Sequence, residues 1–177
     1  MSVELIYFVH GTTIDNEQDL ATGQAHTKLS ELGIKQSKEL INQIDNNFDA
    51  IFVSDLPRSI NSAKLTFGEE RELIVDERLR ECDYGDMNQK PKDWVLTDFI
   101  TTDYPNGESY LDVEIRIKDF LEFLKENYDN KRVALVCHQA PQLAIEVILD
   151  NKSWEEVIDN DWCKTKAWKP GWKYIIE

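Results

Sequence analysis

Residues 4–16 read ELIYFVHGTTIDN, and this stretch decides how the rest of the chain is interpreted. The run Leu5–Val9 consists of strand-forming residues and leads directly into His10 and Gly11. Glycine permits a sharp turn and a close approach to an anion, and Thr13 and the amides of the turn are suited to binding phosphate oxygens. A histidine at such a turn is a candidate nucleophile or general base. The alternative is a strand-end histidine bonded to a backbone carbonyl, without a chemical role.

A second stretch, residues 133–141, has the same form and reads VALVCHQAP. It is an apolar strand pattern that ends at His138, and a helical pattern follows at once, with Pro141 suited to its first turn. His138 therefore lies beside a helix N-terminus, a location that favours anions. Ligands bind at the carboxyl ends of strands in open parallel sheets, so we expect both histidines at one sheet edge.

Strand and helix patterns alternate along the chain. This alternation is typical of a mostly parallel sheet with helices on both faces, so we expect one α/β domain, residues 1–177, built as a three-layer α/β/α sandwich. We expect residues 83–106 to be irregular, and a cap from Ser54 and Asp55 on the second helix. The expected strands are residues 5–9, 50–53, 72–75, 132–137 and 172–176, and the expected helices are residues 30–45, 57–67, 108–127 and 139–149.

Charge and cysteine content narrow the function classes. Lysine and arginine number 20 and aspartate and glutamate 34, and the resulting formal charge of −14 argues against nucleic acid or an anionic membrane as partner. The three cysteines have no metal-site spacing and indicate free thiols in a reducing compartment. No signal peptide or membrane-spanning stretch is recognisable, so we expect a cytoplasmic protein. We expect no metal or other cofactor, and the sequence does not indicate an oligomeric state.

Two more polar residues follow predicted strands. Arg58 falls in the first turn of the helix after residues 50–53, and a guanidinium there can bind phosphate through two hydrogen bonds. Glu81 precedes a turn and offers a carboxylate. Taken singly, a surface arginine and a solvated glutamate are the simpler interpretations.

Together these residues resemble the histidine phosphatase superfamily, also called the phosphoglycerate-mutase-like family. The matching segments occur in the family's order between residue 5 and about residue 150. They are His10-Gly11-x-Thr13-x-x-Asn16, Leu29-Ser30-x-x-Gly33-x-x-Gln36, Ser54-Asp55-Leu56-x-Arg58-Ser59, Leu79-Arg80-Glu81-x-x-Tyr84-Gly85, Gly107-Glu108-Ser109-x-x-Asp112 and Val136-Cys137-His138.

The resemblance implies phosphoryl transfer through a phosphohistidine on His10, without a metal. Arg58 and His138 would stabilise the transferred group, and Glu81 would protonate the leaving oxygen and then activate water. The compact chain looks more like a phosphatase acting on a small phosphorylated substrate than like a mutase, which remains the alternative. The implied catalytic residues are His10, Arg58, Glu81 and His138, and the implied substrate-binding residues are Gly11, Thr13, Asn16 and Gln139.

One departure from the family concerns Val9, because the family normally has arginine before the nucleophilic histidine. Loss of that contact would weaken transition-state stabilisation by roughly 2–4 kcal/mol. A weakened enzyme and a non-catalytic phospholigand-binding protein therefore both stay open. Gln139 also stands where glycine is common. In an extended segment Arg78 and Arg80 face the same side and Glu81 faces the opposite side. If Glu81 points into the pocket, the two arginines should therefore point out of it.

Two remaining features have competing interpretations. Trp162, Trp168 and Trp172, interleaved with lysines at 164, 166, 169 and 173, form either a closing strand with core and edge tryptophans or a protein-interaction module. His26 lies in a polar loop and is expected to be solvated.

Overall fold

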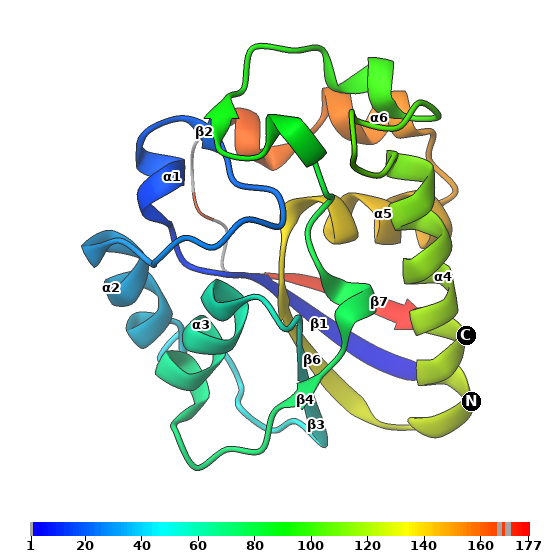
Figure 1. The fold of residues 1–177 in the computed structure, drawn as a ribbon. Helices are drawn as coiled ribbons and strands as arrows, with labels where there is room; N and C mark the ends of the chain where they lie inside the picture. Colours follow the sequence, from blue (N-terminus) through cyan, green and yellow to red (C-terminus); the bar gives the residue numbers. More distant parts are fainter. Residues whose placement is uncertain (1, 166–167, 169–170) are drawn as a thin grey trace.

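The computed structural model describes residues 2–165, 168 and 171–177, and its centre is a five-stranded sheet of order β4-β3-β6-β1-β7 (Figure 1). Strands β4, β3, β6 and β1 pair in parallel, and β7 closes the sheet antiparallel to β1. The strands are β1 Val3–Val9, β2 Leu20–Ala21, β3 Ala50–Val53, β4 Ile74–Val75, β5 Lys90–Pro91, β6 Arg132–Cys137 and β7 Trp172–Ile176. The mostly parallel α/β architecture is confirmed.

Helices cover both faces of this sheet, with α2 and α3 on one side and α4 and α5 on the other (Figure 1). The α-helices are α1 Ile14–Glu17, α2 Glu31–Leu40, α3 Pro57–Phe67, α4 Tyr110–Asn127, α5 Gln139–Asp150 and α6 Trp154–Asp159. Short 3₁₀ turns, η1 to η4, span Glu77–Leu79, Gly85–Met87, Leu96–Phe99 and Trp162–Thr165. The interpretation of the chain as one domain stays a prediction.

The alternation of side chains along β1 explains the two layers of core. Leu5 and Tyr7 pack with the apolar stripe of α4, whereas Phe8 packs on the other face with the α2–α3 side. Strand side chains alternate between faces, so one buried strand serves both cores. The α4 stripe that the sequence predicts is fully buried and consists of Val113, Ile117, Phe120, Leu121 and Leu124.

Local signals set several element ends as predicted. Ser30 caps α2 by accepting from the Gly33 amide, and Ser109 forms a capping box with Asp112 at the start of α4. The predicted cap of α3 is wrong: Leu56 occupies the cap position without a side-chain bond. Helix α2 ends at Leu40 rather than at residue 45.

Residues 83–106 form η2, β5 and η3, and β5 pairs with β2 in a small antiparallel sheet. This irregular segment lies above the carboxyl ends of β1 and β6 together with α6 (Figure 1). Within the described part of the chain, no helix is both long and apolar enough to cross a membrane.

Candidate active site

The two strand-end histidines meet at one edge of the sheet. Val9 pairs with Cys137 in the parallel register of β1 and β6, so the next residues, His10 and His138, emerge side by side. Their ring centroids are 5.1 Å apart. One phosphoryl group can therefore contact both rings, which is the convergence that the strand-end positions predict.

The contacts of His10 define its tautomer. Its Nδ1 lies 2.7 Å from the carbonyl oxygen of Gly11, which can only accept, so Nδ1 carries the proton. Its Nε2 accepts from Nε of Arg58 at 3.2 Å. Both contacts specify a neutral imidazole with its lone pair on Nε2, the form that a nucleophilic histidine requires.

Burial keeps both imidazoles neutral. Desolvation and the neighbouring Arg58 charge lower the pKa of His10 to about 3. The same two causes, in the same order, hold the pKa of His138 well below its ordinary value. Either ring would therefore serve phosphate as a neutral nucleophile or neutral hydrogen-bond donor.

His138 is held by partners on neighbouring strands. Its Nε2 lies 2.6 Å from Oγ of Ser54, which follows β3. The Tyr7 hydroxyl donates to the His138 carbonyl at 2.6 Å and accepts from its amide at 3.1 Å. Among the described residues, Nδ1 of this buried ring has no hydrogen-bond partner. The ring is fully buried and His138 is not part of the described pocket lining, so its contact with a substrate stays a prediction.

Arg58 is a buried cation, 1% exposed, in the first turn of α3. Its guanidinium donates to the carbonyls of Gly23 at 2.6 Å and Ala25 at 3.1 Å, besides its contact with His10. Burial lowers the pKa of Arg58, and the nearby Glu81 carboxylate opposes that shift. A guanidinium nevertheless stays protonated in proteins, so Arg58 places a fixed charge beside Nε2 of His10.

The Glu81 carboxylate sits against the N-terminus of α5. Its Oε1 accepts from the amides of Cys82 and Ala140, both at 2.9 Å, and among the described residues its Oε2 accepts only from the Gln139 amide at 3.2 Å. Oε2 is therefore the oxygen with more capacity to carry and deliver a proton. Arg78 and Arg80 point away as predicted, since Arg78 binds Asp76 and Asp119 and Arg80 binds Asp55.

A pocket of about 670 Å³ opens over His10 and contains Val9, Arg58 and Glu81 in its wall. Acidic and basic side chains both contribute, so the surroundings of the buried site carry mixed charge. The other lining residues are Thr12, Asn16, Glu17, Asp19, Leu20, Ala21, Thr22, Gly23, Tyr84, Lys92, Leu96, Gln139, Asp161, Trp162, Cys163, Lys164 and Trp168.

The four residues predicted to bind substrate separate into two pairs. Asn16 and Gln139 line the pocket. Thr13 is fully buried and caps α1, and the Gly11 amide donates to Oγ of Ser62 at 3.0 Å. Contacts thus give no support to a phosphate-binding role for Gly11 and Thr13.

Gly11 is a glycine for a different reason from the predicted approach to an anion. A Cβ at Gly11 would lie 2.3 Å from the Gly33 carbonyl oxygen, and a Cβ at Gly33 would lie 1.9 Å from the Thr12 carbonyl oxygen. The turn after β1 therefore packs directly on α2, and glycine is required on both sides of the contact.

Sequence reasoning missed two contributors to the site. Ser54 was expected to cap α3, but Leu56 holds the cap position. The Ser54 hydroxyl accepts from the Leu56 amide at 3.3 Å and also contacts the His138 ring. Lys92, from the irregular segment, lies 3.4 Å from Oε1 of Gln139 at the pocket. No local pattern indicates either contact, because both join segments far apart in the chain.

The C-terminal tryptophans divide between core and pocket. The Trp162 and Trp172 rings pack at 5.5 Å, and Trp172 belongs to closing strand β7, while Trp162 and Trp168 line the pocket. Lys166 and Lys169, which belong to the alternative of a protein-interaction module, lie outside the described residues. His26 is exposed, as expected.

The described residues contain no group of three or more histidine, cysteine, aspartate or glutamate side chains that could hold a metal ion.

Comparisons with known proteins agree with this geometry. The family model for branch 1 of the histidine phosphatase superfamily matches residues 6–163. Phosphoserine phosphatase 1 of Hydrogenobacter thermophilus is 28% identical, with 89% of this chain and 83% of that protein covered. The 2,3-bisphosphoglycerate-dependent phosphoglycerate mutase of Sinorhizobium fredii is 26% identical, with 90% and 85% covered. The alpha-ribazole phosphatase of Shigella flexneri shares the fold, with a TM-score of 0.78, 23% identity, and 88% and 84% covered.

Proposed function

The chain belongs to the histidine phosphatase superfamily, and on that basis we propose that it hydrolyses a small phosphomonoester through a phosphohistidine at His10. The observation that carries the proposal is the pairing of His10 with its neighbours. Nδ1 is committed to the Gly11 carbonyl, and Nε2 faces Arg58 beside the His138 ring. A neutral imidazole whose remaining lone pair faces a fixed cation suits attack on phosphorus.

In the first step, Nε2 of His10 forms a bond to phosphorus while the bond from phosphorus to the leaving oxygen breaks. Arg58 turns its Nε–H from His10 to a phosphoryl oxygen, and Nδ1 of His138 contacts another. Glu81, protonated on Oε2, gives its proton to the leaving oxygen. The products are the alcohol and phosphorylated His10.

In the second step, Glu81 takes a proton from water, and the water oxygen attacks phosphorus. The bond between Nε2 and phosphorus breaks and its electrons return to His10, which releases inorganic phosphate. If a sugar hydroxyl replaces water as acceptor, the same residues perform a mutase reaction. Relatives of both kinds match this chain over most of its length.

Location and partners belong to the same proposal. The partner is a small phosphorylated molecule rather than nucleic acid or a membrane, in line with the net charge of −14. The three cysteines are free thiols, which suits a reducing cytoplasm.

The test is turnover of a phosphomonoester panel by chelator-treated protein, with His10→Ala as the matched inactive variant. Release of inorganic phosphate that His10→Ala abolishes supports hydrolysis. Transfer to an added alcohol without phosphate release indicates the mutase alternative. Binding of phosphomonoesters without turnover would contradict the proposal and indicate a phospholigand-binding protein.

A further inference from the structure

In the described part of the chain, the residues that lead from β4 to Glu81 are not paired as a strand, and Asp83 accepts one backbone bond from the Glu108 amide. Strand β4 ends at Val75, and the chain then passes through η1, Glu77–Leu79, before it reaches the pocket. A side chain that delivers a proton must be held within a fraction of an ångström of its acceptor, and an unpaired segment does not provide this by itself.

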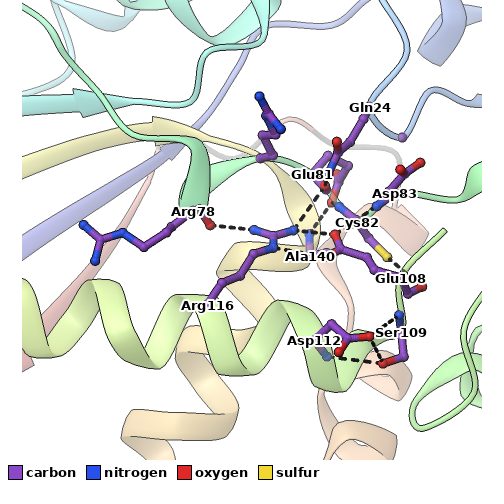
Figure 2. Close-up of polar contacts among 12 residues, drawn as sticks. Gln24, Arg78, Glu81, Cys82, Asp83, Glu108, Ser109, Asp112, Arg116 and Ala140 are labelled. Atoms are coloured by element: carbon purple, nitrogen blue, oxygen red, sulfur yellow. Dashed lines mark hydrogen bonds and ion pairs between the residues drawn. The ribbon is translucent and has the colours of Figure 1, made fainter.

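Side chains supply these partners instead: Gln24 donates from Nε2 to the Glu81 carbonyl at 3.1 Å, and Arg116 of α4 contacts two carbonyls of the segment. Nη1 of Arg116 donates to the Arg78 carbonyl at 2.5 Å, and Nη2 donates to the Glu81 carbonyl at 3.2 Å (Figure 2). The guanidinium thus bridges the carbonyls of Arg78 and Glu81, which are three residues apart. Because a guanidinium is planar and rigid, it fixes the distance between these two carbonyl oxygens.

Glu108 completes the arrangement from the other side. Its Oε1 accepts from Nη2 of Arg116 at 2.7 Å and from the Asp83 amide at 3.0 Å (Figure 2). The ion pair is partly shielded, with side chains 17% and 20% exposed for Arg116 and Glu108. A shielded pair of this kind holds its geometry better than a pair on the surface.

We propose that the Arg116–Glu108 pair is a positioning device for Glu81, and this inference rests on the proposed phosphatase function. Neither side chain belongs to the described pocket lining, so neither touches the substrate. The pair sets the backbone of residues 78–83, while the α5 amides at Gln139 and Ala140 set the carboxylate. The backbone of Glu81 and its carboxylate are therefore each held by a separate set of contacts.

The kinetic test separates positioning from a general loss of structure. Arg116→Gln removes the bridge, and we compare phenyl phosphate, whose leaving oxygen needs a proton, with p-nitrophenyl phosphate, which needs it far less. We expect kcat/KM to fall about 10- to 100-fold for phenyl phosphate and less than about 3-fold for p-nitrophenyl phosphate. Arg116→Lys, which keeps the charge but not the fork, should recover little of the loss.

A second variant tests whether Arg116 acts through Glu81. In the Glu81→Gln background, Arg116→Gln should cost less than about 3-fold more, because the group that it positions is already absent. Independent, multiplying losses would overturn the proposal. So would equal losses with both substrates.

Arg132 supplies a matched control. It also joins a carboxylate, Glu4 at 2.6 Å, to two backbone carbonyls, those of Asp45 and Asn47, but it does so at the opposite end of β6 from His138. Arg132→Gln should lower kcat/KM by the same factor for phenyl phosphate and for p-nitrophenyl phosphate. A preferential loss on phenyl phosphate in this variant would show that destabilisation alone produces the effect.

Cys82 reports on the same segment without any turnover. It is fully buried next to Glu81, and a Cys163→Ser background removes the more exposed thiol. Arg116→Gln should speed labelling of Cys82 by a thiol reagent about 10-fold over the parent, and Arg132→Gln should not. Unchanged labelling overturns the positioning device. If the wild-type protein shows no turnover but Arg116→Gln still speeds labelling of Cys82, the proposed function is refuted, whereas the role of the Arg116–Glu108 pair in holding the segment is supported.

Discussion

Val9→Arg should strengthen phosphate binding and raise activity. Val9 is the last residue of β1, lines the pocket and directly precedes His10. In the described lining, the cation that contacts His10 is Arg58, whereas Lys164 pairs with Asp159. An arginine at position 9 would bring a second guanidinium to the transferred phosphoryl group.

The size of the gain follows from two opposing effects. One charge-assisted contact to phosphate contributes about 2–4 kcal/mol. Position 9 is only 6% exposed and lines the same pocket as Arg58, so desolvation and like-charge repulsion offset roughly 1 kcal/mol. The remaining difference, about 1–3 kcal/mol, corresponds to about a 5- to 150-fold increase in kcat/KM.

The assay combines steady-state kinetics on p-nitrophenyl phosphate with calorimetric binding of inorganic phosphate. Val9→Met is the control, because it adds length without charge and should change neither quantity more than about 3-fold. Thermal unfolding verifies that each variant is folded. A folded Val9→Arg protein with unchanged or reduced activity would refute the reasoning and show that the site is organised around valine.

Three further predictions concern the same site. The unfolded chain protonates His10 near pH 6.5, whereas the folded protein, in which the pKa of His10 is lowered to about 3, does not, so the free energy of unfolding should decrease as the pH is lowered from about 7.5 to about 5. His10→Gln should remove about 2 kcal/mol of that decrease, measured by denaturant titration at each pH. Ser54→Ala removes the partner of His138 Nε2 and should lower kcat about 10-fold with an unchanged circular dichroism spectrum; full activity would contradict a role for that contact. Gly11→Ala places a Cβ 2.3 Å from the Gly33 carbonyl and should destabilise the protein by about 2–4 kcal/mol in thermal unfolding, whereas a wild-type melting temperature would show that the turn can move away from α2.

The residues that approach the site along their own strands were predictable from the sequence. His10 and His138 each end an apolar strand pattern, and parallel pairing then brings them together at one edge. Helix α4 was predictable for a similar reason, since its cap and its apolar stripe are both local signals. The short helix α6 had such a signal too, the capping box of Ser153 and Glu156, and was overlooked.

Contacts that depend on strand order could not be predicted in the same way. Ser54 reaches His138 only because β3 lies next to β6, and nothing in either segment specifies that neighbour. The bridge from Arg116 to the Glu81 segment likewise crosses from α4 to an irregular stretch without periodicity. Gly11 shows a third limit, because a glycine signals a close approach without saying which group approaches.

The central claim is that His10 carries the phosphoryl group between substrate and water. The direct measurement is mass spectrometry of protein mixed rapidly with a phosphomonoester and quenched in alkaline denaturant, which preserves phosphohistidine. We predict that the peptide containing His10 gains one phosphoryl group, that Glu81→Gln accumulates more of it with p-nitrophenyl phosphate because water is no longer activated, and that His10→Ala gains none. Turnover without any phosphorylated His10, or a phosphoryl group on another residue, would contradict the account.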